Sequence, residues 1–171
     1  MKRILKILFI VLSIILLSSI YVSAENNLNI DGVDLALGSD KDDVLSLIDT
    51  RFKVNKLKDD YVLLMNNDGP PYITKGILLF KDGILNTIDR NWGTYNSDNL
   101  SEFRDSFLGL LKNFTKDNGK PSIIIEETNA PGFKASSIKI SLNNKKMIIL
   151  FSDYQKQGLS VGIQEEISLS E

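Results

Sequence analysis

Residues 97–121, SDNLSEFRDSFLGLLKNFTKDNGKP, decide the fold. Apolar residues recur in this stretch at intervals of three and four, which places them on one face of an α-helix of about four turns. They are Leu100, Phe103, Phe107, Leu110, Leu111 and Phe114. Ser97 or Asp98 begins the predicted helix, Asn118-Gly119 supplies a left-handed C-terminal cap, and Pro121 prevents continuation. Such an apolar face must be covered by another element.

The sequence on both sides of this helix predicts β-strands. Four are expected after the helix, at residues 122–127, 137–142, 146–151 and 159–167. Four are expected before it, at residues 52–57, 61–65, 76–81 and 84–90. Asp82-Gly83 joins the last two of the earlier set and is a strong hairpin signal, because both residues tolerate a positive φ angle. Successive hairpins predict antiparallel pairing.

A shorter helix is predicted upstream, after Gly38. Ser39 is a suitable N-cap, and the acidic residues that follow it favour the positive end of a helix. The apolar stripe of this helix consists of Val44, Leu45, Leu47 and Ile48, and it reaches toward Phe52. Residues 30–35, before the helix, are interpreted as a first strand or an extended arm.

The predicted layout therefore repeats once, as a helix followed by about four strands, in halves 30–92 and 96–167. Helices that follow runs of strands indicate an α+β fold. We expect one antiparallel sheet of about eight strands with two helices on one face. The helix residues expected to pack on the sheet are Val44, Ile48, Phe103, Phe107, Leu110, Leu111 and Phe114.

The N-terminus has the three-part pattern of a cleavable secretory signal. A short positive segment precedes an apolar run over residues 7–22, and Val22-Ser23-Ala24 suits a signal peptidase. The run is shorter than the ~20 residues that span a hydrocarbon core, so we expect cleavage of residues 1–24 rather than a retained membrane anchor. The mature protein would be a single exported domain, residues 25–171, in the periplasm or outside the cell.

Composition excludes several kinds of chemistry. The chain has no Cys, which excludes a disulfide, a thiol nucleophile and a lipid-bearing cysteine, and no His, which excludes an imidazole general base. Without its signal the chain would carry 17 Lys and Arg against 22 Asp and Glu, a net charge of −5. That charge argues against binding a nucleic acid backbone. The acidic spacings match no calcium loop, and we expect no catalytic, cofactor-binding or metal-binding residues.

The element order resembles two families of exported proteins. Leu37-Gly38-Ser39-Asp40-Lys41-Asp42-Asp43-Val44 resembles the phrase that opens a helix in these families. One is the β-lactamase inhibitor protein family, which has two tandem helix-plus-four-strand units, and the other contains small envelope proteins similar to the outer-membrane assembly component BamE. The resemblance implies a non-enzymatic protein that binds other proteins through its sheet and loops.

The candidate binding surface consists of Tyr72, Arg90, Trp92 and Tyr95. Residues 92–96 are interpreted as a connection before the second helix, and Trp, Tyr and Arg are the favoured anchors of protein interfaces. The alternative is that Trp92 packs beneath the second helix as part of the core.

Several predicted strands are apolar on both faces. Examples are residues 62–65, 77–80 and 147–151. If both helices cover one face, the other must be buried internally or by a partner, because contiguous exposed apolar patches mark interfaces.

We therefore expect a non-enzymatic binding module, either a protein inhibitor or an envelope-assembly accessory, whose partner is another envelope or secreted protein. One alternative is a carboxylate-dependent hydrolase that uses acids such as Glu126-Glu127 or Glu165-Glu166. Adjacent strand residues face opposite sides, so each such pair offers one carboxylate to each face. The other alternative is a structural envelope protein that self-associates through its sheet.

Overall fold

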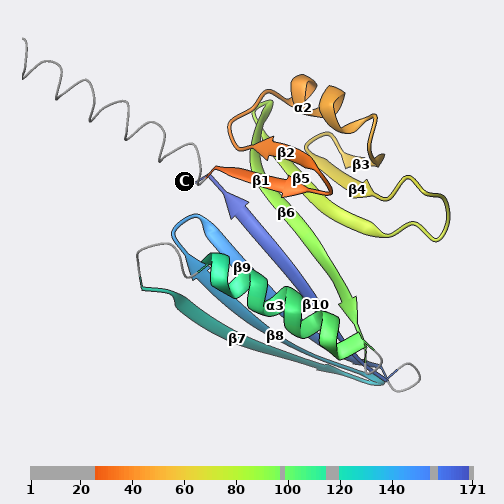
Figure 1. Ribbon diagram of the computed structural model, residues 1–171, viewed down its shortest axis with the longest axis vertical. Helices are drawn as coiled ribbons and strands as arrows, with labels where there is room; N and C mark the ends of the chain where they lie inside the picture. Colours follow the sequence, from red (N-terminus) through yellow and green to blue (C-terminus); the bar gives the residue numbers. More distant parts are fainter. Residues whose placement is uncertain (1–25, 97–98, 115–119, 155–157, 170–171) are drawn as a thin grey trace, which may run out of the picture.

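Figure 1 shows the computed structural model, which describes residues 26–96, 99–114, 120–154 and 158–169. The expected α+β class is confirmed, with two helices and a large antiparallel sheet in the described residues. The predicted signal at residues 1–24, the start of the second helix at Ser97 or Asp98, and its Asn118-Gly119 cap lie outside the described residues.

The main sheet has eight strands in the order β3-β4-β5-β6-β10-β9-β8-β7, and every neighbouring pair is antiparallel. The first four are β3 (Lys53–Lys58), β4 (Tyr61–Met65), β5 (Thr74–Lys81) and β6 (Ile84–Tyr95). The last four are β7 (Ser122–Ala130), β8 (Phe133–Leu142), β9 (Lys145–Tyr154) and β10 (Gly158–Ser168).

Each set of four strands follows one helix. Helix α2 (Lys41–Ile48) precedes β3–β6, and helix α3 (Leu100–Phe114) precedes β7–β10. The last strand of each set, β6 and β10, pair with each other at the centre of the sheet. The two helix-plus-four-strand sets are thus joined edge to edge into one continuous surface.

The N-terminal segment forms a hairpin that was not expected. Residues 30–35 are not one strand, because Asp31 and Gly32 both adopt positive φ angles and turn the chain back. Strands β1 (Asn27–Ile30) and β2 (Val33–Ala36) pair as a separate two-stranded sheet. Asp-Gly is the same turn signal that joins β5 to β6.

Two element boundaries differ from the expectation. Asp40, not Ser39, caps α2, since its side chain accepts a hydrogen bond from the Asp42 backbone N–H, and the helix ends at Ile48 before Phe52. Residues 92–96 are not a connection, because β6 continues to Tyr95. A register shift opposite Ile163 and Gln164 shows that β6 carries an extra residue there, and Gly93 adopts a φ of 127°. This β-bulge lets the strand continue past Trp92.

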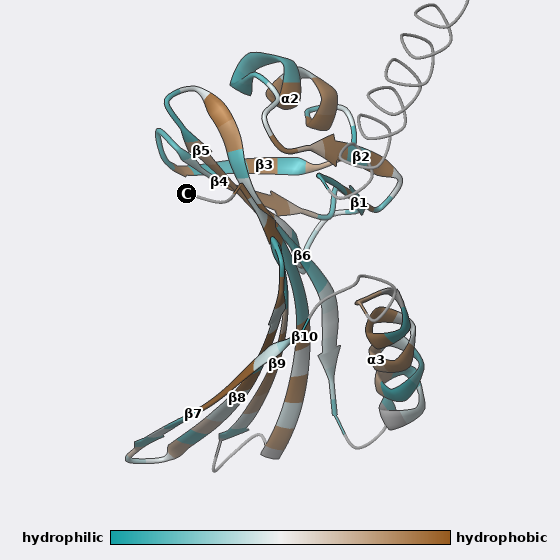
Figure 2. Ribbon diagram, turned by 90° about the vertical axis from the view of Figure 1, so that its left-hand side faces the viewer, coloured by the Kyte–Doolittle hydropathy of each residue, from teal (hydrophilic) through white to brown (hydrophobic). Residues whose placement is uncertain are grey.

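Both helices cover the same face of the sheet (Figure 2), as expected. Under α2 and the β1–β2 hairpin lies a first hydrophobic core that includes Val44, Ile48, Leu78, Ile88 and Ile167. Under α3 lies a second core, built from Tyr95, Leu110, Phe114, Leu142, Met147 and Ile163. Ile163 and Ile167 are four residues apart on β10 and therefore point to one face, so the two cores lie side by side on it.

The helix-free face is concave. Figure 2 shows the sheet from its edge, and both ends of the sheet bend away from the side that carries α3. No helix in the part of the chain that the structure describes combines the length and the apolar character needed to cross a membrane.

Candidate binding surface on the concave face

The concave face carries apolar side chains that no helix covers. Strand alternation places those on β4, β5 and β9 there, because they alternate with buried residues on the helix-bearing face, and the register places Ile124 beside Lys139 and Ile148. They are Tyr61, Leu63 and Met65 on β4, Ile77 and Leu79 on β5, Ile148 and Leu150 on β9, and Ile124 on β7. All of them are half-buried or exposed.

Three charged residues lie at the centre of this face. Asp89 on β6 is directly opposite Glu166 on β10, which is directly opposite Lys146 on β9. Among the described residues, the one ion pair within this trio joins Lys146 Nζ to Glu166 Oε1 at 2.6 Å. One lysine therefore faces two carboxylates, and the trio has a net negative charge when all three groups are ionised.

Asp89 is the member of the trio whose acidity is changed. The pKa of Asp89 is raised from its ordinary value of 3.8 to about 6, chiefly by burial and also by the charge of Glu166, while the charge of Lys146 lowers it. Like charges directly opposite each other in a sheet are destabilising. The concave face thus holds a carboxylate that the folded chain stabilises poorly.

Sequence reasoning did not find this carboxylate pair. Glu126-Glu127 and Glu165-Glu166 were each expected to offer one carboxylate to each face of the sheet, and the strand register agrees. Glu165 pairs with Arg90 on the helix-bearing face, and Glu166 pairs with Asp89 on the concave face. The missing information was the pairing of β6 with β10, two strands that are separated by a helix and three other strands. A sequence pattern predicts each strand but not which distant strand lies beside it.

Three of the four residues proposed as a binding surface lie together, but on the helix-bearing face. The Arg90 guanidinium lies 3.8 Å from the centre of the Trp92 ring, and Trp92 Nε1 donates a hydrogen bond to Glu165 Oε2 at 3.0 Å. We call Arg90, Trp92 and Glu165 the Trp92 clamp. Trp92 is half-buried against the second core, and Glu165 pairs with Met147, which belongs to that core.

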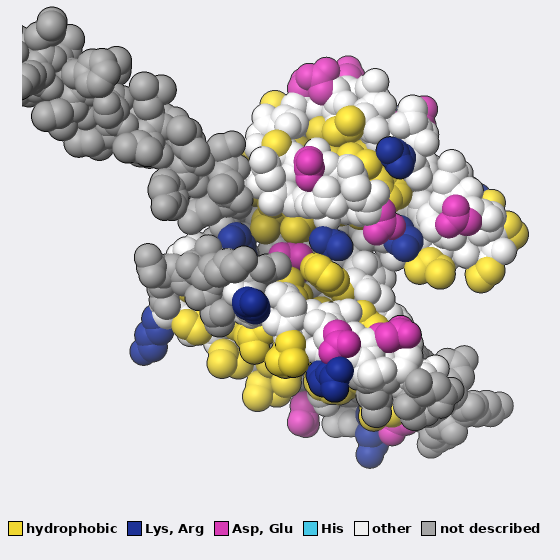
Figure 3. All heavy atoms as spheres, viewed as in Figure 1, with side chains coloured by type: hydrophobic (Ala, Val, Ile, Leu, Met, Phe, Trp, Pro, Cys, Tyr) yellow, Lys and Arg dark blue, Asp and Glu magenta, His cyan; other side chains and the backbone are white. Residues whose placement is uncertain are grey.

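The Trp92 clamp holds a carboxylate between the two cores. Burial raises the pKa of Glu165, while the hydrogen bond from Trp92 and the positive charges of Arg90 and Lys145 lower it. Figure 3 shows charged side chains of both signs in the space between the α2 layer and the α3 layer. The clamp therefore joins the halves of the sheet where the hydrophobic packing is interrupted.

Tyr95 and Tyr72 have different surroundings. Tyr95 is 6% exposed; its hydroxyl donates to the Trp92 carbonyl oxygen at 2.9 Å and lies 2.9 Å from Ser106 Oγ of α3. It is a core residue. Tyr72 is 45% exposed and contacts another element, because Lys53 Nζ of β3 lies 3.4 Å from the centre of its ring.

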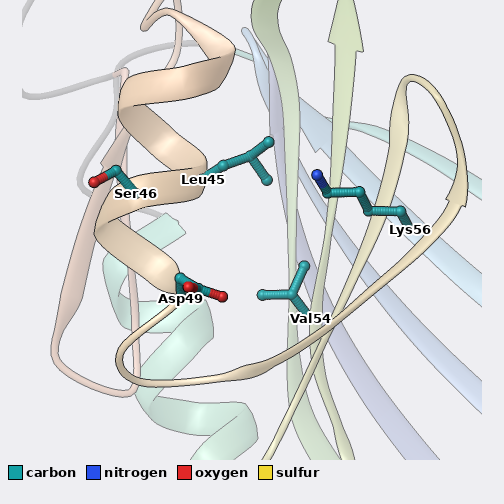
Figure 4. Close-up of a pocket in the computed structure, with 5 residues that line it drawn as sticks. All are labelled: Leu45, Ser46, Asp49, Val54 and Lys56. Atoms are coloured by element: carbon teal, nitrogen blue, oxygen red, sulfur yellow. The ribbon is translucent and has the colours of Figure 1, made fainter.

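Two hollows among the described residues lie away from the central trio. One of about 400 Å³ lies between α2 and β3 (Figure 4), where Leu45 and Asp49 point toward the strand and Ser46 points away. A larger one, of about 600 Å³, includes Tyr61 and Leu79 at the rim of the concave face. Neither of these two hollows includes Asp89 or Glu166.

No group of three or more metal-ligating side chains occurs in the described segments. Comparison with protein families, with curated proteins and with solved structures gives no match to this chain.

Proposed function

We propose that this chain is a non-enzymatic, exported binding module that holds another protein against the concave face of its sheet. The proposal rests on two features of that face. Its apolar side chains are not covered by a helix, and in its central trio one lysine, Lys146, faces two carboxylates, Asp89 and Glu166. Interface cores combine apolar contact with a few polar groups that fix orientation. The proposed partner is a secreted or envelope protein, which agrees with the export signal expected from the sequence.

The shape of the surface supports a protein rather than a small molecule as the ligand. Small-molecule sites are concave pockets that enclose most of the ligand, whereas this face extends across strands from β4 to β7. The hollow beside Tyr61 and Leu79 lies at its rim and could receive one anchoring side chain of a partner. A convex protein surface would cover the apolar residues on both sides of the charged trio.

The carboxylate pair does offer a second interpretation, a hydrolase. Asp89 and Glu166 are opposed, and one of them has a raised pKa, as a general acid requires. However, Lys146 is paired with Glu166, and neither acid lines the hollows found among the described residues. A hydrolase positions its acids in a cleft that encloses the substrate and excludes water, so binding accounts better for this geometry.

Site-specific photocrosslinking tests the proposal. A photoreactive amino acid replaces Ile148, on the concave face, in one variant, and Leu159, an exposed apolar residue of β10 on the opposite face, in the matched control. In the exported fraction of the source cells, Ile148 should crosslink to one defined protein, and Leu159 should not. The substitution Leu150→Lys, also on the concave face, should abolish that crosslink by placing a charge in the apolar surface. Equal crosslinking from both positions, or none from Ile148, would contradict the proposal.

A further inference from the structure

Strand β7 is an edge of the sheet, and its first half is apolar on both faces. Every residue from Ser122 to Ala130 is exposed, and the three consecutive isoleucines Ile123, Ile124 and Ile125 are 62%, 52% and 67% exposed. An edge strand presents unpaired backbone N–H and C=O groups, which form a template for another strand. Three exposed isoleucines beside such a template leave apolar side chains in contact with water next to backbone groups that can pair with another strand.

The opposite edge of the same sheet is protected. Strand β3 carries Lys53, Lys56 and Lys58, and its pairing with β4 is interrupted by a register shift between Lys56 and Lys58. Lysines and bulges on an edge strand are the common means of preventing edge-to-edge association. β7 runs through nine continuous pairs with β8, with no such shift. The chain therefore blocks the β3 edge, whereas on β7 the charged residues Glu126 and Glu127 lie only after the three isoleucines and leave residues 122–125 open.

We propose that β7 is a dimer interface, at which it pairs antiparallel with β7 of a second copy around a two-fold axis at Ile124. In this register residue 124 faces residue 124 of the second copy, and Ile123 faces its Ile125. All six isoleucines then form cross-strand pairs, and β-branched pairs of this kind stabilise sheets. The two eight-stranded sheets become one continuous sheet.

Charge complementarity supports this register. Lys120, two residues before β7 begins, comes opposite Thr128 of the second copy and diagonal to its Glu126, where it joins the existing ion pair of Glu126 with Lys139. Glu126 and Glu127 of the two copies do not face each other, since they are opposite Ser122 and Pro121. The pairing thus brings opposite charges together at both ends, and like charges remain apart.

The apolar surface near β7 extends the interface on the helix-bearing face. Figure 3 shows hydrophobic side chains gathered beside α3, over the region where β7 and β8 lie. Ile123 and Ile125 are directly opposite Ile140 and Ile138 of β8, which are half-buried. A second copy that continues the sheet would cover this patch, and a two-fold arrangement closes the assembly at two copies, whereas β7 against β3 would build an open filament.

Cysteine crosslinking tests the two-fold axis directly, because the natural chain has no cysteine. Residues directly opposite in an antiparallel pair have Cα atoms about 4.5–5.5 Å apart, which is within the range that a disulfide spans. The variant Ile124→Cys should therefore form a disulfide-linked dimer rapidly under mild oxidation. The matched control is Leu57→Cys on the β3 edge, where the natural residue is 54% exposed; it should stay monomeric on a denaturing gel.

The oligomeric state of the natural protein supplies the independent measurement. Light scattering after size-exclusion chromatography should show a dimer, and Ile124→Lys should convert it to a monomer, because two lysines would face each other at the axis. Ile124 is exposed, so the fold should be retained, which circular dichroism checks. A monomer at every concentration, or mixed disulfides between Ile124→Cys and Leu57→Cys chains, would overturn the proposal. Neither measurement involves the partner proposed for the concave face.

Discussion

The indole Nε1 of Trp92 lies 3.0 Å from Oε2 of Glu165 and donates a hydrogen bond to it, across the strand pair β6–β10 that unites the two halves of the sheet. Glu165 is half-buried, and its pKa is raised by that burial. Its charge depends on Trp92 and on Arg90, which stacks on the same indole ring. The polar contact thus lies at the boundary between two hydrophobic cores.

Because of this hydrogen bond, we expect the NMR signal of Trp92, the single Trp of the chain, to follow the protonation of Glu165. Protonation of Glu165 weakens the acceptor, so the indole N–H resonance of Trp92 should shift with a midpoint above 4.5, the ordinary pKa of a glutamate side chain. Arg90→Gln should raise that midpoint, because the arginine's positive charge favours the carboxylate. Arg104→Gln, in an exposed pair with Asp105, is the control and should leave it unchanged. A titration that persists in Glu165→Gln would assign the shift to another group.

The raised pKa of Asp89 should make the free energy of unfolding depend on pH. Because its pKa is raised from 3.8 to about 6 in the folded chain, the folded state binds more protons than the unfolded state between these values. Its contribution to the free energy of unfolding therefore falls as the pH rises through this window. Asp89→Asn, which is neutral at every pH, should be more stable than the natural protein at pH 7.5 by about 1–2 kcal/mol, after allowance for solvent screening.

Urea unfolding at several pH values measures this effect. The stability difference between Asp89→Asn and the natural protein should shrink toward zero as the pH falls to 4, where the unfolded Asp89 also gains its proton. Other carboxylates contribute equally to both proteins and cancel in the comparison. A difference that stays constant with pH would show that the substitution acts through packing and not through the charge.

Periodicity and turn chemistry sufficed to predict the class of the fold and most of its elements. β4 (Tyr61–Met65) has the predicted bounds, because its turns and its apolar run are both local signals. The β1–β2 hairpin was missed although Asp31-Gly32 carries the same signal as Asp82-Gly83. Residues 92–96 were expected to form a connection, whereas in the structure Trp92 and Gly93 belong to a bulge within β6.

The candidate site was harder to predict, because it depends on contacts between distant strands. Trp92 and Arg90 are two residues apart, so their association could be expected from the sequence. Their partner Glu165 and the pair Asp89–Glu166 arise only from the antiparallel register of β6 and β10, which no local pattern specifies. The exposure of β7 also follows from strand order, since a strand of isoleucines is equally typical of the centre of a sheet.

We expect substitutions of Tyr95 to lower the stability of the fold. Tyr95→Phe keeps the ring against Phe103 but loses the bond to the Trp92 carbonyl oxygen, which should cost about 1 kcal/mol. Tyr95→Ala also empties part of the second core and should cost about 3–5 kcal/mol. Tyr72→Phe, at an exposed position, should change stability by less than about 0.5 kcal/mol. Urea denaturation separates the three variants, and an unaltered midpoint for Tyr95→Ala would argue against its place in the core.

The lack of a side chain at Gly76 allows the hairpin β1–β2 to pack closely against the main sheet. A Cβ atom at this position would lie 2.5 Å from the Asp89 carbonyl oxygen and 2.7 Å from Ile30 Cδ1. The first contact is with backbone of the neighbouring strand and the second with the hairpin, so Gly76→Ala must displace one of them. The cost should be about 2–3 kcal/mol, and the amides of β1 and β2 should lose protection in hydrogen exchange.

Gly162 on β10 is the matched control for Gly76, because it is also a strand glycine without a positive φ angle. Its nearest neighbours would lie 3.9 and 4.0 Å from an added Cβ, which is ordinary contact. Gly162→Ala should therefore leave the hairpin protected and stabilise the chain slightly, by about 0.5 kcal/mol, since alanine loses less backbone entropy on folding. Equal losses in both variants would show that any side chain at a strand glycine disturbs the sheet, and that Gly76 is not the specific contact that seats the hairpin.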